Sequence, residues 1–187
     1  MYGVLGEDKS DVDTLKAIIR KIAGNESISI CGHGFDSASQ MLKRGESVIR
    51  LLADLGCRWF IIAYDADGSD PHARWQDVYS RVVKPAGIES YCIVIPVQEL
   101  EAWILADIEA VTKVFTGWCP TPIEYPEHIP KPKELLEKLS RDSKHRPRYS
   151  HATHNHRVAK YLDLEKVQQK CASIRPLINF VRGAKAA

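Results

Sequence analysis

Four short apolar runs, separated by stretches with helical spacing, constrain the fold of this chain most strongly. The runs cover residues 2–6, 27–31, 57–64 and 91–95. The third run is almost continuously apolar, as is typical of a strand that is buried on both faces in a parallel sheet. Because strands and helices alternate along the first part of the chain, we predict an α/β fold with a doubly wound, mostly parallel sheet.

The stretches between and after these runs predict helices over about 11–23, 45–55, 72–84 and 99–115, where apolar residues recur every three or four positions. Ser10 and Asp70 precede two of these helices and carry side chains that can accept a hydrogen bond from the first helical turn. Residues 32–39 are rich in turn-forming residues and are expected to form a loop.

The character of the sequence changes after residue 116. Residues 117–132 are rich in proline and lack helical periodicity, which is typical of a linker or an ordered surface loop. Short helices are expected over 133–140, 163–172 and 176–182, with a polar stretch over 141–156. We therefore predict an α/β core over residues 1–116 and a C-terminal helical appendage over residues 117–187.

Composition narrows the class of protein without identifying it. With 187 residues, of which 44% are hydrophobic, the chain is long enough to bury a substantial core. The formal net charge is only +2, so any argument for a nucleic-acid partner must come from where charges cluster. The five cysteines are odd in number and widely spaced, which favours reduced thiols and a cytoplasmic location. No apolar stretch approaches the length of a membrane span.

Carboxylates follow two of the apolar runs. Glu7 and Asp11 come after the first run, and Asp65 and Asp67 come after the third. In an open α/β sheet, ligands bind outside the carboxyl ends of the strands, and hard divalent cations prefer oxygen ligands. The pattern therefore predicts a site for Mg²⁺ or Mn²⁺ at this edge of the sheet. Helix capping explains Asp11 equally well, and ordinary turn chemistry can account for an Asp-x-Asp loop.

Two glutamates follow the fourth run. Glu99 and Glu101 are two positions apart, so on a helix their side chains point in different directions and only one of them can face a given site. We expect Glu101, which lies beside Trp103, to be the further metal ligand. The alternative is a negatively charged first turn that stabilises the helix.

The pattern Glu7-x-x-x-Asp11, together with Asp65-x-Asp67, resembles the TOPRIM fold shared by primases, type II topoisomerases and OLD-type nucleases. The Glu-x-x-Ser-Asp form of the first motif is most similar to the OLD type. In more detail, residues 32–34, 63–67 and 96–107 resemble a bacterial domain-of-unknown-function family, number 4276, with a TOPRIM-like core. This second resemblance extends over nearly the whole chain.

The resemblance implies metal-dependent phosphoryl transfer. Glu7 would act in acid–base catalysis or bind metal, Asp65 and Asp67 would bind Mg²⁺, and Asp11 would match an extra acidic ligand of OLD-type sites. The implied activity is that of a nuclease or phosphodiesterase that acts on nucleic acid in bacterial defence against phage. Because the chain has no G-x-x-x-x-G-K-[ST] loop of its own, the resemblance also implies a separately encoded ATPase partner.

Basic residues are concentrated between residues 131 and 160. Clusters of Lys and Arg bind phosphate backbones, and the candidates for such contacts are Lys131, Lys144, Arg146 and Arg148. OLD-type nucleases also use a lysine, for which Lys131 and Lys133 are candidates, with Lys133 as the predicted catalytic residue. A solvated surface is the simpler explanation of the basic stretch.

Two other functions fit part of the pattern. A metal-stabilised adaptor, which binds nucleic acid or protein without turnover, would explain the modest net charge and the unassigned lysine. A hydrolase of phosphorylated small molecules is less consistent with the sequence, because such enzymes often place a nucleophilic Asp directly after the first strand, where this chain has Glu7.

Overall fold

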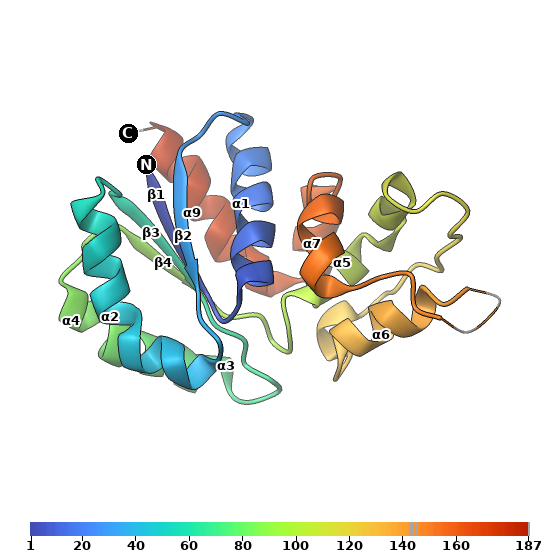
Figure 1. Ribbon diagram of the computed structural model, residues 1–187, viewed down its shortest axis with the longest axis horizontal. Coiled ribbons are helices and arrows are strands. Elements are labelled where there is room, and N and C mark those ends of the chain that lie inside the picture. Colours follow the sequence, from blue (N-terminus) through green and yellow to red (C-terminus); the bar gives the residue numbers. More distant parts are fainter. Residues whose placement is uncertain (143, 145, 187) are drawn as a thin grey trace.

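Four parallel strands form the central sheet in residues 1–142, 144 and 146–186, the part of the chain that the computed structural model describes (Figure 1). The strands are β1 (Tyr2–Gly6), β2 (Ile30–Gly34), β3 (Trp59–Ala63) and β4 (Tyr91–Val94), in the order β2-β1-β3-β4. All neighbouring strands are parallel. The prediction of an α/β fold with a parallel sheet is confirmed.

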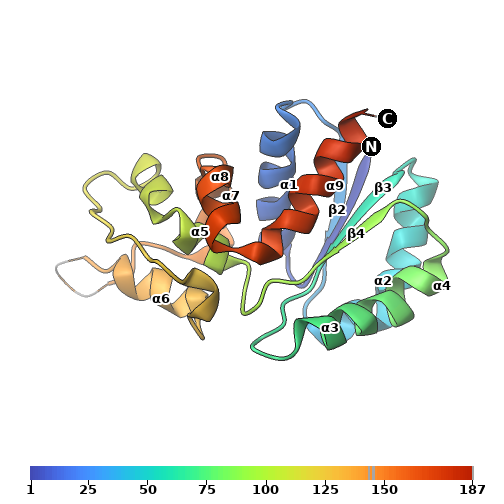
Figure 2. The same ribbon diagram turned by 180° about the vertical axis from the view of Figure 1, so that it is seen from behind.

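Helices cover both faces of this sheet (Figures 1 and 2). One face carries α1 (Lys9–Ala23) and α9 (Arg175–Ala186). The other carries α2 (Ala38–Asp54), α3 (Pro71–Val78) and α4 (Lys84–Ala86), with a π-helical turn over Tyr79–Val83. α2 begins earlier than predicted because the side chain of Ser37 caps it, and Asp70 caps α3 as expected.

The strands divide the apolar core between the two faces because successive side chains point to opposite sides of a sheet. Val4 and Ile61 are partners across β1 and β3, and both pack against the core that contains α1 and α9. Leu5 and Ile62 are the next partners along and pack against α2 and α3. All four side chains are fully buried. Burial on both faces explains why the run that forms β3 is almost continuously apolar.

The turn from β1 into α1 is tight. A Cβ atom at Gly6 would lie 2.8 Å from the Cβ of Asp11, so a larger residue does not fit there. Asp8 caps the helix, since its side chain accepts the N–H of Asp11 and the Asp11 side chain accepts the N–H of Asp8. The prediction that Ser10 caps this helix is wrong. Ser10 lies inside the first turn, where its hydroxyl donates to the carbonyl of His151 at 3.0 Å.

Strand β2 includes residues that were predicted to form a loop. Gly32 and Gly34 lie in the strand because they pair with Val4 and Gly6 of β1, and only glycine fits there because the start of α1 passes close to them. A Cβ atom at Gly34 would lie 2.4 Å from the carbonyl carbon of Asp8, and one at Gly32 would lie 2.4 Å from the side chain of Val12. The prediction of a loop over 32–39 is therefore correct only for residues 35–37, which lie between β2 and α2.

The single helix predicted over 99–115 is in fact two shorter segments. α5 (Glu101–Ala106) is followed by the 3-10 helix η2 (Ile108–Lys113), and Asp107 between them has backbone angles outside the helical region. The side chain of Asp107 accepts the N–H of Asp163 at 2.7 Å. This contact with a distant segment fixes the position of the break.

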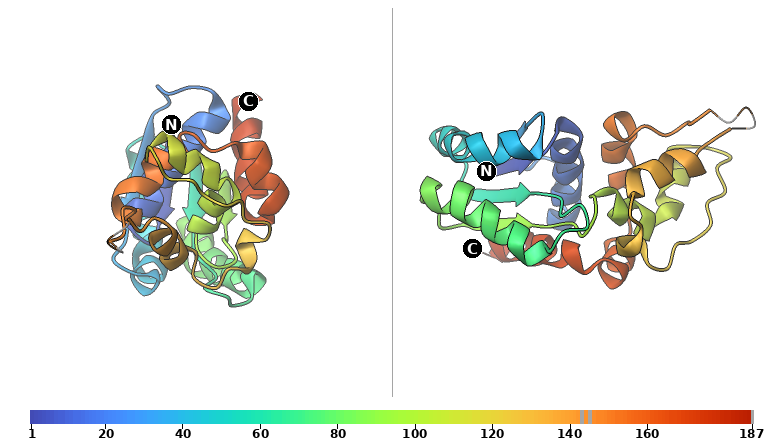
Figure 3. Two further views of the ribbon diagram at one scale, coloured as in Figure 1. Left: turned by 90° about the vertical axis from the view of Figure 1, so that its right-hand side faces the viewer. Right: turned by 90° about the horizontal axis from the view of Figure 1, so that it is seen from below.

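Residues 101–174 form a helical lobe beside the sheet (Figure 3). Besides α5 and η2, the lobe contains η3 (Pro126–His128), α6 (Pro132–Leu139), α7 (His151–Ala159), α8 (Leu164–Lys170) and η4 (Ala172–Ile174). α7 begins inside the stretch that the sequence indicates only as polar. It packs along α1 and so joins the helical lobe to the sheet.

The chain returns to the sheet in α9, its last helix. Leu177, Ile178 and Val181 of α9 are buried in the same core as Val4 and Leu15, and this core continues into α5 and α7. α9 therefore packs on the sheet although it belongs to the predicted appendage over 117–187. The division of the chain at residue 116 stays a prediction.

Two further expectations concern cysteines and membranes. All five cysteines are free, in agreement with their spacing. No helix in the described ranges combines the length and the apolar character that crossing a bilayer requires.

Candidate metal centre

Glu7 and Asp65 meet at the point where the order of the strands reverses. In the sheet, β2 lies on one side of β1 and β3 lies on the other side. The chain therefore changes direction across the sheet at β1, and the crevice between the ends of β1 and β3 is a topological switch point. Glu7 directly follows β1, and Asp65 lies just beyond β3. The N–H of Asp65 donates to Oε1 of Glu7 at 2.8 Å. Two residues that are 58 positions apart are thus joined where such sheets bind their ligands.

The loop after β3 is held against the segment after β4. The N–H groups of Ala66, Asp67 and Gly68 donate to the carbonyls of Pro96, Gln98 and Val97 at 2.9, 3.2 and 3.1 Å. Asp67 has a φ of 49°, a left-handed conformation that few residues other than glycine adopt readily. This turn leaves Asp67 exposed and Asp65 partly buried. Residues held in such conformations cluster at functional sites.

Asp11 and Glu101 are the most deeply buried of the predicted ligands. Asp11 is 9% exposed in the first turn of α1, where its Oδ2 accepts the N–H of Asp8 at 3.1 Å. Glu101 is 1% exposed at the start of α5. Burying a carboxylate is unfavourable unless it is hydrogen-bonded or paired with a positive charge. Each of the two accepts a hydrogen bond, Asp11 from the N–H of Asp8 and Glu101 from the amide of Asn155.

The carboxylates lie close enough to repel one another. Burial raises the pKa of Asp65 well above its ordinary value, and the charges of Asp11, Glu7 and Glu101 raise it further. Burial and the charges of Asp8 and Glu101 raise the pKa of Asp11 to about 8. Burial also raises the pKa of Glu7, an effect that the hydrogen bond from Asp65 only partly offsets. The hydrogen bond between Glu7 and Asp65 joins two of these residues, and the raised pKa values of Asp65 and Asp11 indicate that Asp11 and Glu101 lie near them; we call Glu7, Asp11, Asp65 and Glu101 the acidic cluster.

Glu101 is bound by a chain of polar groups from the helical lobe. Nδ2 of Asn155 donates to Oε1 of Glu101 at 2.9 Å, and the hydroxyl of Tyr149 donates to Oδ1 of Asn155 at 2.6 Å. Burial raises the pKa of Glu101, whereas Lys133 and Asn155 lower it. The charge of Glu101 raises the pKa values of Asp11 and Asp65, whereas Glu99 accepts the backbone N–H of Lys133.

The two candidate lysines differ in their surroundings. Lys133 is partly buried at the start of α6, and its N–H donates to Oε2 of Glu99 at 2.9 Å. Burial lowers the pKa of Lys133, but the charges of Glu101 and Glu99 outweigh this effect and raise the pKa. Lys131 is exposed, and its Nζ lies 2.8 Å from Oε1 of Glu134. Lys133 is thus the one of the two that lies beside the carboxylates.

The acidic cluster does not form a complete coordination shell by itself. In the part of the chain that the structure covers, no three His, Cys, Asp or Glu side chains are arranged to hold a metal ion. Mg²⁺ usually keeps several waters and binds one or two carboxylates together with substrate phosphates, so it does not require such a cage. Repelling oxygen ligands at a switch point fit this mode of binding. The role of each carboxylate as a metal ligand stays a prediction.

The predicted nucleic-acid contacts lie elsewhere on the helical lobe. Lys144, Arg146 and Arg148 are exposed, in the part of the chain between α6 and α7. Arg148 also lies 5.7 Å above the ring of Phe115 and so contributes to packing. His145, another member of the basic stretch, lies outside the described residues.

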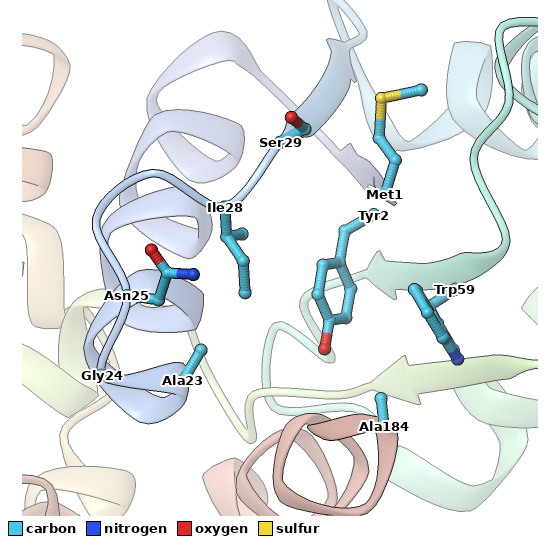
Figure 4. Close-up of a pocket in the computed structure, with 9 residues that line it drawn as sticks. All are labelled: Met1, Tyr2, Ala23, Gly24, Asn25, Ile28, Ser29, Trp59 and Ala184. Carbon is cyan, nitrogen blue, oxygen red and sulfur yellow. The ribbon is translucent and has the colours of Figure 1, made fainter. Parts of the chain in front are cut away.

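A cavity of about 590 Å³ opens at the opposite end of the sheet (Figure 4). Tyr2 and Trp59, the first residues of β1 and β3, line it together with Ile28. Its described lining contains no acidic or basic side chain. The cavity therefore offers no side chain suited to phosphoryl transfer, and the acidic cluster remains the candidate site.

Asn155 is a site residue that the sequence analysis missed. Asn155 is fully buried in α7, and Val158, Ala159 and Leu162 follow it at spacings of three, four and seven residues. This spacing is typical of the buried face of a helix. A polar residue on an otherwise apolar helical face is the signal that could have identified it.

The fold and the site define a doubly wound α/β protein with an acidic cluster at its switch point. The chain belongs to the family described as "Domain of unknown function (DUF4276)", whose sequence profile matches residues 6–182. The resemblance to this family is confirmed, whereas the likeness to TOPRIM domains and OLD-type nucleases stays a prediction. No curated protein and no solved structure matches the chain.

Proposed function

We propose that this protein is a divalent-cation-dependent phosphodiesterase, with a TOPRIM-like site, that cleaves nucleic acid. The proposal rests on the contact between Glu7 and the N–H of Asp65 at the switch point, with Asp11 and Glu101 close enough to raise the pKa of Asp65. Gathering these carboxylates from separate elements is unfavourable in the absence of a cation. A bound Mg²⁺ or Mn²⁺ would be the largest local charge and would reverse this balance.

The chain's own groups account for the other parts of the reaction. When bound, the cation would neutralise charge on a phosphodiester and activate the attacking water. Asp65, Asp67 and Asp11 provide oxygen ligands. Glu7 accepts the proton of the water, and burial helps because it raises the pKa of Glu7 toward the range in which a carboxylate is an effective general base.

Lys133 supplies positive charge at the same place. The charges of Glu101 in α5 and Asp11 in α1 both raise the pKa of Lys133. A cation fixed in this way can stabilise negative charge that develops on the phosphate. Lys131, which is exposed and paired with Glu134, is assigned to phosphate contacts outside the site.

The basic surface supports a polymeric substrate. The helical lobe that supplies Lys133 also carries the exposed Lys144 and Arg146. Side chains of this kind bind the nucleic-acid backbone without reading its sequence, and such binding weakens as salt rises. The likeness to OLD-type nucleases extends the proposal to defence against phage, together with a separately encoded ATPase.

Cleavage assays with two matched double variants test the proposal. Supercoiled plasmid and a long RNA are incubated with Mg²⁺ or Mn²⁺ and the wild type, the Asp65→Asn/Asp67→Asn variant or the Asp54→Asn/Glu89→Gln variant. Asp54 and Glu89 are exposed, so the second variant matches the first in charge change but leaves the cluster intact. We expect about 100-fold or greater loss of cleavage only in the first variant. Equal cleavage by both variants, or cleavage that survives chelation of the metal, would refute the proposal.

A non-catalytic adaptor is the second candidate. This metal-stabilised adaptor is favoured by the exposed Lys144 and Arg146, which can bind nucleic acid without any turnover. This function predicts that the wild type and Glu7→Gln bind nucleic acid equally well and that neither cleaves it. Mg²⁺-dependent cleavage that is lost in Glu7→Gln would exclude the adaptor.

A further inference from the structure

A polar network that connects Glu101 to Tyr149 is buried at the junction of the sheet and the helical lobe. Glu101, Asn155 and Tyr149 are 1%, 0% and 2% exposed. Replacing buried charged groups by apolar residues of similar volume is often neutral or stabilising. Stability alone therefore does not explain why this position carries a carboxylate and its partners.

The donors and acceptors of the network fix how Asn155 is oriented. Its Oδ1 accepts the hydroxyl of Tyr149 at 2.6 Å, which leaves Nδ2 to donate to Oε1 of Glu101 at 2.9 Å. The orientation of an amide is assigned from such a network. In this orientation Nδ2 of Asn155 holds Oε1 of Glu101 and so fixes where the carboxyl group of Glu101 lies.

The backbone and the ring of Tyr149 are both fixed by neighbouring groups. The N–H groups of Arg148 and Tyr149 both donate to Oγ of Ser140, at 3.0 and 2.9 Å, and Ser140 is buried. The ring of Tyr149 lies 5.8 Å from that of Phe115. The hydroxyl that orients Asn155 therefore projects from a fixed backbone and a packed ring.

α7 connects the two helices that carry the most deeply buried carboxylates. At its start, the carbonyl of His151 accepts the hydroxyl of Ser10, the neighbour of Asp11 in α1. One turn further along, Asn155 binds Glu101 of α5. α7 thus sets the position of α1 relative to α5, and with it the separation of Asp11 and Glu101.

We propose that Asn155, oriented by Tyr149, is a positioning residue that holds Glu101 as the ligand that the helical lobe contributes to the divalent cation. The inference rests on the proposed function, because it assigns a supporting group to the same site. Partners of metal ligands orient those ligands, and their loss typically weakens metal affinity. The helical lobe is then part of the metal site and not only a platform for nucleic acid.

Mn²⁺ binding to the metal-free protein tests this proposal without any activity assay. Isothermal titration calorimetry is carried out on the wild type, Tyr149→Phe, Asn155→Leu, Glu101→Gln and the Glu101→Gln/Asn155→Leu double variant. Tyr161→Phe is the matched control, because Tyr161 is 52% exposed. Tyr149→Phe removes only one hydroxyl and keeps the packed ring, so it remains informative if Asn155→Leu fails to fold. Circular dichroism and thermal unfolding establish that each variant is folded.

We expect Asn155→Leu to weaken Mn²⁺ binding by about 10- to 100-fold and Tyr149→Phe to weaken it by a smaller factor. Since Asn155 acts through Glu101, the double variant should bind no more weakly than Glu101→Gln alone, as residues that act as a unit are not additive. Wild-type affinity in folded Tyr149→Phe and Asn155→Leu would overturn the inference while leaving the proposed function intact. Absence of Mn²⁺ binding by the wild type would overturn both. Tight, Asn155-dependent binding without cleavage would overturn only the proposed function.

Discussion

Replacing Asp11 by Asn should stabilise the metal-free protein near neutral pH. Burial and the charges of Asp8 and Glu101 raise the pKa of Asp11 to about 8. The folded protein therefore holds a proton on this side chain that the unfolded chain has released. Asn avoids this proton uptake, and its Oδ1 can still accept the N–H of Asp8 that Asp11 now accepts.

The size of the effect follows from the pKa. A carboxyl group whose pKa is raised by folding favours the folded state at low pH, and its stability contribution falls as pH rises from the ordinary value toward the raised one. The ordinary Asp value is about 3.9, and each pH unit corresponds to about 1.4 kcal/mol. At pH 7 the cost for Asp11 is thus on the order of 4 kcal/mol, an upper bound because neighbouring carboxylates relax. At pH 4 it is close to zero.

Urea unfolding in the presence of a chelator measures this difference. With a denaturant slope of about 2 kcal/mol per molar urea, the midpoint of Asp11→Asn at pH 7 should exceed that of the wild type by about 1 to 2 M. The advantage should shrink at pH 5 and nearly vanish at pH 4. Asp13→Asn is the control, because Asp13 lies in the same helix but is partly exposed, 3.9 Å from Lys16. Its effect should stay below about 1 kcal/mol.

Two results would refute this reasoning. A midpoint for Asp11→Asn at or below that of the wild type at pH 7 would mean that Asp11 is not repelled by its neighbours. An advantage that is independent of pH would mean that the gain arises from packing and not from proton uptake. In either case, charge repulsion among the carboxylates would no longer support a divalent-cation site at the acidic cluster.

Three further predictions concern the metal, a tight helix approach and a buried indole. Mg²⁺ competes with protons for carboxylates of raised pKa, so its effect on stability should depend on pH. In a thermal-shift assay, 10 mM Mg²⁺ should raise the melting temperature by about 2 °C or more at pH 8 and by almost nothing at pH 5. An equal shift at the two pH values would contradict this. Gly34→Ala should lower the free energy of unfolding by about 3 kcal/mol, because its Cβ would lie 2.4 Å from the backbone of Asp8. As the matched control, Gly183→Ala, whose new Cβ meets no described atom outside its own stretch of helix within 4 Å, should raise the free energy of unfolding by up to about 1 kcal/mol in the same urea experiment. Trp103→Phe should cost about 1 to 3 kcal/mol, because the fully buried indole donates to Oγ of Ser173 at 2.8 Å; an unchanged urea midpoint would exclude that contribution.

The order of strands and helices could be predicted because it depends on local patterns. The apolar run that forms β3 and the helical spacing of α1 each identify their element without knowledge of the rest of the fold. β2 could not be located correctly, because Gly32 and Gly34 are favoured there by the close approach of α1 and not by any preference for loops. The break at Asp107 likewise depends on a contact with Asp163, which is 56 positions away.

The members of the acidic cluster were predictable from their positions after the strands. Glu7 and Asp65 stand at the ends of β1 and β3, and the rule that parallel strands bind ligands at their carboxyl ends brings them together. The supporting groups were not predictable in the same way. Asn155 reaches Glu101 only because α7 packs between α1 and α5, and no local pattern fixes that tertiary contact.

The return of α9 to the sheet has a consequence for synthesis in the cell. Leu177, Ile178 and Val181 cover the same side of the sheet as α1, so this side is completed only after residues 175–186 have been synthesised. At about 5 to 20 residues per second, a ribosome needs on the order of 10 to 30 s to reach that point after making β1. Until then, the apolar side chains on this side of the sheet lack part of their packing. The chain therefore cannot complete this core before α9 has left the ribosome.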